Sequence, residues 1–330
     1  MSEQSWQGRP GTPGITLPDF VVAVDIGGTK IAAGGVAKNG QLTHSVSIPT
    51  PRNDARALLD AVVSLVRGVC EAAGGHPAGV GVAVAGAVDP DHGDVHYAPN
   101  IPALHEFPLR RLLSEAVGLP VLVGFDGHLT ALGEHRMGAG RGCRNMVLLT
   151  VGTGIGGGLI LDGRLYRGSD NLAGAAGWMV ADPATVDAAG SRSVGNLENV
   201  SAGPAIAASH GSAGIGGSHT SAEDVLAAAR AGDQHAQEVL SEASRFLAHA
   251  VTGIVSLLNP EKVIIGGGLG STGIFLAPVR AAVAAFAQPT SRHRVVIETA
   301  ALGPDAALVG AACALFEEVQ EWPQGPKSRS

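Results

Sequence analysis

The chain repeats one local plan, in which an apolar segment runs into a glycine-rich turn and a second apolar segment returns from it. The first copy runs from Phe20 to Val36 and turns at Gly27-Gly28-Thr29. The second runs from Val147 to Leu161 and turns over Gly152–Gly158. Short apolar runs bounded by glycine are typical of buried strands. Two copies of one such unit in 330 residues predict two similar α/β domains.

The predicted domains take up most of the chain. An N-terminal α/β domain is expected over residues 20–128, completed by a C-terminal helix over residues 304–319, and a second α/β domain over residues 129–303. Residues 1–19, which hold Gly, Pro, Ser and Thr without an apolar run, are interpreted as a disordered tail, and so are residues 320–330. Apolar spacing predicts helices over 54–73, 109–117, 130–137 and 306–319 and two more over 221–258, strands at 80–85, 121–123 and 263–265, and a loop at 209–218.

Composition argues against several classes of protein. A net charge of -7 is unfavourable for a nucleic-acid surface, which needs clustered Lys and Arg, so a small-molecule partner is expected. Cys70, Cys143 and Cys313 lie far apart in sequence, which gives neither a disulfide framework nor a CxxC metal site and favours a reducing cytoplasm. Apolar runs are interrupted by glycine or charge before they reach 18 residues, and no signal-peptide core is seen. We expect a cytoplasmic protein without a membrane partner.

Three glycine-rich turns follow apolar strands, the third at Gly266-Gly267-Gly268. Ligands of open α/β sheets bind at the carboxyl ends of strands, and backbone N–H groups of such turns can point together at phosphate oxygens. Any one turn could be a structural hairpin, but three at strand ends favour phosphate binding. The candidate phosphate-binding residues are Asp25, Gly27, Gly28, Thr29, Lys30, Gly152, Thr153, Gly154, Gly156, Gly157, Gly266, Gly267 and Gly268.

Two common nucleotide-binding patterns do not fit these glycines. The GxxxxGK[ST] pattern of P-loop proteins does not occur. Residues 152–157 read GxGxGG, but no helix is expected to follow, and the acidic residue of a dinucleotide-binding fold is not found about 20 positions further on. The sequence therefore indicates a different nucleotide-binding fold.

Three long segments resemble those of the ROK family of bacterial sugar kinases. DIGGTK at residues 25–30 resembles that family's first phosphate loop, and VGTGIGGGLILDGRLYRG at 151–168 resembles its second. LLNPEKVIIGGGLG at 257–270 resembles its adenosine-binding segment. The resemblance runs from Phe20 to about Val319 and implies an α/β fold of two actin-like (ribonuclease H-like) ATPase domains with a cleft between them. It also implies a homodimer that uses ATP and Mg²⁺ to phosphorylate a hydroxyl of a hexose or amino-hexose, expected to be the 6-OH.

Asp126 is the candidate catalytic base. Transfer to a sugar hydroxyl needs a carboxylate that accepts the hydroxyl proton, and Asp126 follows a predicted strand where the resemblance places that base. The alternative is that Asp126 only caps the helix starting near Leu129. Asp25 is expected to orient Mg²⁺ or its water shell, with an ordinary turn-stabilising role equally open.

The sugar pocket departs from the family pattern. Asn100, in an Ala-Pro-Asn-Ile-Pro segment, resembles part of the family's sugar loop, and Gly86 and Glu198 are the other expected sugar contacts besides Asp126. Phe125 replaces the Asn that precedes the family's base, and Ala175-Ala176-Gly177-Trp178 stands where the family has ExGH. A buried sugar hydroxyl left without a partner costs about 1–3 kcal/mol, so glucose should fit less well than in typical members.

The same comparison predicts that structural zinc is absent. The resemblance places zinc ligands at four positions, which hold Trp178, Ala189, Ser191 and Asn196 here. None of these offers the sulfur or imidazole donors that Zn²⁺ prefers. Trp178 either stacks on a sugar face or fills space left by the zinc loop, with packing the favoured interpretation. His128, beside the candidate base, either contacts substrate or is a solvated loop residue.

Three other functions compete with a glucose kinase. The family contains sugar-binding repressors, but these carry an N-terminal helix-turn-helix that 19 Gly/Pro-rich residues cannot build. A catalytically weak or inactive sugar or nucleotide sensor is conceivable because the pocket is altered. A kinase for a modified hexose, such as the 3-amino sugar kanosamine, fits best with phosphate loops that are kept and ring contacts that are changed.

Overall fold

The computed structural model describes residues 20–211 and 221–320, which form two compact units. The first unit contains residues 20–137, 168–172 and 305–320, and the second contains residues 138–167, 173–211 and 221–304. The predicted tails lie outside the described residues, except that residue 320 ends the last helix. Of the predicted loop 209–218, residues 209–211 end a helix and the rest lies outside the described residues.

Unit 1 is built on a five-stranded sheet in the order β3-β2-β1-β4-β7. Strands β1, β2 and β3 form an antiparallel meander, and β4 and β7 continue the sheet parallel to β1. Because β1, β4 and β7 run the same way, their carboxyl ends meet at one edge of the sheet. The strands are β1 (Phe20–Ile26), β2 (Lys30–Ala37), β3 (Leu42–Pro49), β4 (Val80–Val84) and β7 (Val121–Phe125), with a separate pair β5 (Ala87–Val88) and β6 (Val95–Tyr97).

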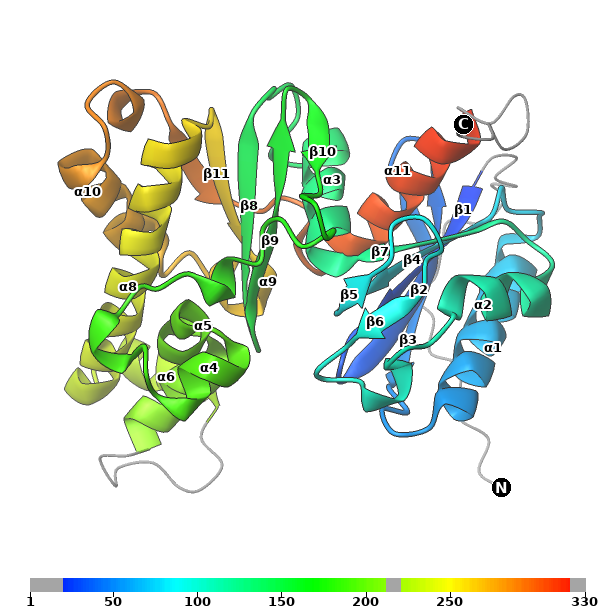
Figure 1. The fold of residues 1–330 in the computed structure, drawn as a ribbon, viewed down its shortest axis with the longest axis horizontal. Helices are drawn as coiled ribbons and strands as arrows, with labels where there is room; N and C mark the ends of the chain where they lie inside the picture. The colour runs from blue at the N-terminus through cyan, green and yellow to red at the C-terminus, as the bar shows by residue number, and fades with distance from the viewer. Residues whose placement is uncertain (1–19, 212–220, 321–330) are drawn as a thin grey trace. The chain divides into compact units, whose positions relative to one another are not determined.

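Helices cover both faces of this sheet (Figure 1). Helix α1 (Ala55–Ala73) starts at the N-cap Asp54 and packs its apolar stripe on alternating side chains of β1 and β4. Helix α11 (Ala306–Gln320) comes from the end of the chain and packs on the other face, beside α3 (Asp126–Met137). Glycines let these helices come close: the backbone at Gly310 touches Leu129, and a Cβ at Gly133 would collide with Ala306. Helix α2 (Leu109–Val117) packs beside α1.

Unit 2 repeats the sheet of unit 1 strand for strand. Its order is β10-β9-β8-β11-β12, again an antiparallel meander of the first three strands followed by two strands parallel to β8. The strands are β8 (Met146–Val151), β9 (Ile155–Leu161), β10 (Arg164–Tyr166), β11 (Lys262–Gly266) and β12 (Val296–Thr299). The repeated α/β plan predicted from the glycine turns is therefore confirmed.

Helices α8 and α10 pack side by side and enclose a second core with β8, β11 and β12 (Figure 1). Phe275, Val251 and Leu247 are fully buried in it. The helices of unit 2 are α4 (Ala189–Val194), α5 (Asn196–Ser201), α6 (Gly203–Gly211), α7 (Ala222–Arg230), α8 (Gln234–Leu258), α9 (Gly267–Gly270) and α10 (Leu276–Phe286). None of the described helices combines the length and apolar character needed to cross a membrane.

The sequence left several elements out or bounded them differently. Helix α3 begins at Asp126 rather than near residue 130 and lies wholly in unit 1, so the unit continues past residue 128 to Met137. Strand β9 begins at Ile155, so only Gly152–Gly154 form the second turn. The glycines expected to form a third turn become the short helix α9 from Gly267 onward.

Candidate functional site

The first glycine turn is held between two strands of unit 1. The Gly27 N–H donates to the Lys30 carbonyl at 3.1 Å and closes the turn. Thr50, which directly follows β3, supports it from the side: its hydroxyl donates to the Gly27 carbonyl at 2.7 Å, and its N–H donates to the Thr29 carbonyl at 3.1 Å. Thr29 and Lys30 are exposed at the tip. The turn is thus fixed on both sides while its tip stays open to a ligand.

Two predicted sugar-site residues, Asn100 and Gly86, lie in unit 1, and Asn100 packs directly against this turn. A Cβ at Gly28 would lie 2.7 Å from the Cβ of Asn100, so only glycine lets the Asn100 segment approach. Gly86 acts in a similar way, since a Cβ there would lie 2.5 Å from the carbonyl oxygen of Tyr97. Gly86 is buried and Asn100 is exposed. Gly86 therefore has a packing reason of its own, which sequence reasoning did not identify.

Asp25 and Asp126 lie at the same edge of the unit 1 sheet. Asp25 is near the end of β1 and Asp126 directly follows β7, with β4 between the two strands. Burial raises the pKa of Asp25 to about 6, against the opposing effect of the Lys30 ammonium. Burial, and then the nearby charge of Asp25, raise the pKa of Asp126 to about 7. The edge therefore holds two coupled carboxyl groups that ionise close to neutral pH.

Asp126 is the first residue of α3, and its carboxylate accepts the Gly127 N–H at 2.7 Å. This bond lowers the pKa of Asp126 but does not outweigh burial. Its neighbours differ from the sequence interpretation: His128 is only 2% exposed and is no solvated loop residue. The His128 ring meets the Phe125 ring edge-on, with centroids 5.0 Å apart. The residues on either side of Asp126 and Gly127 are therefore packed against each other.

The second turn occupies the matching position in unit 2. The Gly152 N–H donates to the Gly154 carbonyl at 2.9 Å, and the Gly203 N–H donates to the Gly152 carbonyl at 2.8 Å. A Cβ at Gly152 would lie 3.7 Å from the Gly268 nitrogen, so the second turn and the start of α9 are neighbours. Thr153 is exposed at the tip. This unit therefore brings two of the three predicted phosphate-binding segments together.

The remaining glycines of this segment have structural roles. Gly156 and Gly157 were expected in the turn, but they lie in β9, opposite Thr150 and Leu149 of β8. A Cβ at Gly157 would collide with the Leu148 carbonyl. Gly267 has a φ of +81°, and a Cβ there would lie 2.6 Å from the Val151 carbonyl oxygen. Close approach of backbones therefore accounts for Gly157 and Gly267, whereas a Cβ at Gly156 would meet only the Thr150 hydroxyl oxygen, at 3.4 Å.

Glu198 contacts the second turn directly. It lies on α5, and its Oε2 accepts the Ile155 N–H at 2.7 Å, where the turn passes into β9. A Cβ at Gly154 would lie 2.7 Å from the same oxygen. Burial raises the pKa of Glu198, and the bond from Ile155 opposes that rise. A residue expected to contact the sugar is therefore also a neighbour of the second glycine turn.

A hydrogen-bonded cluster occupies the segment aligned with the family's zinc loop. Asn196, only 3% exposed, accepts the N–H groups of Ala181 and Asp182, both at 2.8 Å. Its amide group lies 3.1 Å from the Ser191 hydroxyl and 3.2 Å from the Thr185 hydroxyl, and donates to both. Ser191 in turn donates to the Thr185 carbonyl at 2.8 Å. Among the described residues, no group of three or more His, Cys, Asp or Glu side chains is arranged to hold a metal ion.

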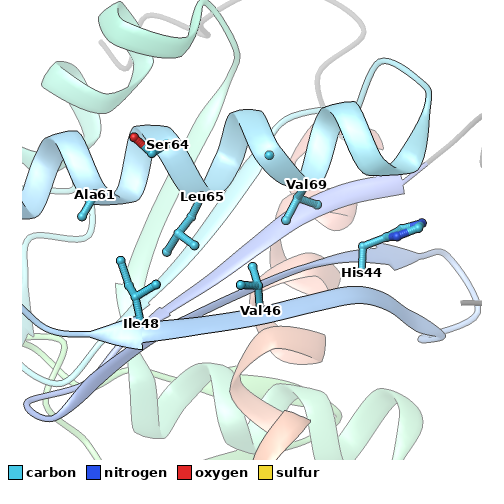
Figure 2. A pocket seen from close by; sticks show the side chains of 8 residues that line it. His44, Val46, Ile48, Ala61, Ser64, Leu65 and Val69 are labelled. Atoms are coloured by element: carbon cyan, nitrogen blue, oxygen red, sulfur yellow. The ribbon is translucent and has the colours of Figure 1, made fainter. Parts of the chain in front are cut away.

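Trp178 does not fill the place of the zinc loop. Its side chain is 59% exposed, so the packing interpretation is wrong, and the polar cluster occupies the interior of this segment instead. A separate apolar groove lies in unit 1 between β3 and α1 (Figure 2). Val46, Ile48 and Leu65 line it, and none of the predicted site residues does. The groove is therefore distinct from the carboxylate edge and from both glycine turns.

Comparison with known proteins assigns the chain to a family. The ROK family profile matches residues 21–318. The glucokinase of Streptomyces coelicolor is 35% identical over 316 residues, covering 89% of this chain and 96% of that protein. The N-acetylmannosamine kinase of Salmonella newport is 30% identical over 291 residues, covering 88% and 96%. The crystal structure of a ROK family glucokinase from Streptomyces griseus in complex with glucose and AMPPNP is 32% identical with a TM-score of 0.79, covering 90% of this chain and 99% of that one.

The repeated sheets and these relatives define the class of protein as one built from two actin-like ATPase domains. The chain belongs to the ROK family. Two features of the site were missed by sequence reasoning. Thr50 directly follows β3, a strand whose only signal was the alternation of Val46 and Ile48 with polar residues. The Asn196 cluster joins residues without any local pattern.

Proposed function

We propose that this ROK-family protein, an ATP-dependent sugar kinase, transfers the γ-phosphoryl group of ATP to the 6-hydroxyl of a hexose or amino-hexose, with Asp126 as the general base. The observation that carries the proposal is the carboxyl edge of unit 1. There a partly buried Asp126, with its pKa raised to about 7, follows β7, which β4 separates from β1, the strand that leads into the first glycine turn. A base is most effective when its pKa lies near the working pH.

The proposed reaction proceeds in one displacement. The sugar oxygen forms a bond to the γ-phosphorus while the bond from that phosphorus to the β–γ bridging oxygen breaks, which leaves ADP. The hydroxyl proton passes to the Asp126 carboxylate as the new bond forms. The Gly127 N–H, which Asp126 accepts at 2.7 Å, keeps one carboxylate oxygen fixed in direction. The other oxygen is then the one that we assign to the sugar hydroxyl.

The glycine turns are proposed to hold the phosphates. In unit 1 this role falls to residues 27–30, and in unit 2 to residues 152–154 with the start of α9 at Gly268. Asp25 fits a magnesium ion, because it supplies carboxylate oxygens two residues before the turn that we assign to the phosphates, and Mg²⁺ is commonly held by one or two carboxylates together with phosphate oxygens. When bound, Mg²⁺ would neutralise charge on the phosphate oxygens. Lys30, exposed at the tip of the first turn, would add a positive charge there.

The substrate is proposed to be a hexose with a changed group on the ring. Asn100, Gly86 and Glu198 remain at the positions that resemble the family's sugar contacts. Phe125 and Ala175 stand where the resemblance implies polar partners, and the Phe125 ring packs on His128 rather than offering a hydrogen bond. A site built to bond a hydroxyl rejects analogues without it by about 10⁴–10⁵, and a site without those partners does not discriminate in that way.

The test is an ATP-consumption screen with glucose, mannose, N-acetylmannosamine, N-acetylglucosamine, glucosamine and kanosamine, with phosphorus NMR of the product. We expect ATP-dependent formation of a sugar 6-phosphate, with kcat/KM for glucose no better than for at least one modified hexose. Absence of any sugar phosphate would refute the kinase proposal. Glucose preferred by tenfold or more would refute the assignment of the substrate class only.

A further inference from the structure

We propose that Glu198 is a positioning residue for the second glycine turn, so that nucleotide binding depends on it even when no sugar is present. The inference rests on the proposed function, because it assigns the turn at residues 152–154 to nucleotide phosphates. It adds a role to a side chain whose expected partner was the sugar alone. The role follows from contacts that lie entirely within unit 2.

The contacts place one carboxylate oxygen where the turn ends. Oε2 of Glu198 accepts the N–H of Ile155, the first residue of β9, at 2.7 Å. Gly154 precedes it, and a Cβ at that position would lie 2.7 Å from the same oxygen. The carboxylate thus lies against the last residue of the turn and the first residue of β9. An ionised acceptor makes a stronger bond to a backbone N–H than a neutral one, especially when it is half-buried.

The backbone that carries Glu198 is itself fixed. The Leu197 N–H donates to the Met179 carbonyl at 3.0 Å. Asn196 binds the N–H groups of residues 181 and 182, which ties the start of α5 to the segment before α4. A Cβ at Gly177 would lie 3.2 Å from the Cβ of Glu198, so that segment packs closely on the side chain. The position of the Glu198 carboxylate, and with it the end of the turn, is therefore fixed by the surrounding backbone.

The two roles of Glu198 predict different effects of substitution. A residue that only contacts the sugar leaves nucleotide affinity unchanged when it is replaced. A residue that holds the turn weakens nucleotide affinity when its acceptor oxygen is lost, and a glutamine, which keeps an acceptor oxygen of the same reach, restores part of it. The readout that separates the two is the affinity for a nucleotide analogue measured without sugar.

The first experiment is calorimetric titration of the full chain with AMPPNP and Mg²⁺ in the absence of sugar. Glu198→Ala should weaken binding about ten- to a hundredfold, the usual worth of a hydrogen bond to a charged group. Glu198→Gln should lose less than Glu198→Ala, because its neutral oxygen still accepts the Ile155 N–H but makes a weaker bond than a carboxylate. Glu242→Gln, which removes an exposed charge on α8 of the same unit, is the matched control and should change nothing. Affinity unchanged in Glu198→Ala, or lost equally in Glu198→Gln, would overturn the proposal.

A second variant reaches the same contact from the other side. Gly154→Ala should push the carboxylate away, and AMPPNP should bind as weakly as it does to Glu198→Ala. In the Glu198→Ala background the same Gly154→Ala change should add less than about twofold, because the group it displaces is gone. An equal loss in both backgrounds would mean that the alanine meets the nucleotide itself, and would overturn the proposal. Wild-type protein that binds AMPPNP but phosphorylates no sugar would refute the kinase proposal and leave this inference standing.

Discussion

The two units share one sheet topology and one position for a glycine turn, yet they support that turn differently. The turn of unit 1 rests on Thr50 and closes against Asn100, with two carboxyl groups at the same sheet edge. The turn of unit 2 rests on the carboxylate of Glu198, whose helix α5 is tied at its start by the hydrogen bonds of Asn196. The repeated plan thus fixes where each glycine turn lies, and the supporting side chains differ between the units. In our account, unit 1 supplies the base and unit 2 supplies a positioned nucleotide turn.

The largest expected effect comes from removing the base in unit 1. Asp126→Asn should lower kcat by about 10²–10⁴-fold, which corresponds to roughly 3–5 kcal/mol of barrier. The affinity of the protein for AMPPNP should stay unchanged, because we assign nucleotide binding in unit 2 to a different turn. The substitution should also raise Tm at pH 8. The folded-state pKa of about 7 lies above the ordinary value of 3.8, so ionising Asp126 in the fold costs stability as pH rises through that range, and an amide avoids the cost.

Steady-state kinetics and thermal melts at pH 8 check both parts. A variant that keeps more than half of wild-type kcat would remove Asp126 from the mechanism. A lower Tm at pH 8 would contradict the raised pKa.

The next effect concerns the support of unit 2. Asn196→Ala should lower Tm by several degrees, because each buried partner left unsatisfied costs about 1–3 kcal/mol and several are left. It should also weaken AMPPNP binding, since α5 carries Glu198. Asn199→Ala, which removes a single bond of 3.3 Å to Ser191, is the control from the same helix and should have the smaller effect. Equal melting temperatures for the two variants would show that the cluster is not the support.

One substitution placed in both turns compares them directly. Gly28→Ala would set a Cβ 2.7 Å from the Cβ of Asn100 and should cost about 1–3 kcal/mol of stability as well as sugar affinity. Gly152→Ala meets only the Gly268 nitrogen, at an ordinary 3.7 Å, and should be tolerated. Urea unfolding of both variants gives the comparison. If Gly152→Ala lowers the free energy of unfolding more than Gly28→Ala does, our account of how the two turns are packed is wrong.

The smallest expected effect is that of metal chelation, which should leave the protein unchanged. Metal analysis of purified protein should find no stoichiometric zinc, and a chelator should not change its Tm, because Ser191 and Asn196 hold this segment by hydrogen bonds at positions where the family resemblance implies zinc ligands. A tightly held zinc ion, or a Tm that falls with chelator, would contradict this assignment.

The sequence was most informative where local chemistry leaves few choices. Glycines between two apolar runs predicted both hairpins and the repetition of one α/β plan in the two units. The start of α3 was missed because Gly127 is a weak helix former and the apolar spacing only begins at Leu129. The extent of the second turn was missed because Gly156 and Gly157 read as turn residues, although Gly157 is needed for close pairing with β8. The role of Asn196 depends on partners 5 to 15 residues away, which no periodic pattern reveals.

The most direct test of the central claim is the pH dependence of kcat/KM for the best sugar, measured from pH 5 to 9. This ratio reports ionisations of the free enzyme. Since the base must be ionised, our account predicts a value that falls as pH drops through about 7 and levels off above it. Asp25→Asn removes the neighbouring negative charge, which lowers the pKa of Asp126, and its residual activity should fall only at lower pH. A wild-type profile that stays flat from pH 5 to 8 would contradict the assignment of a base with a raised pKa.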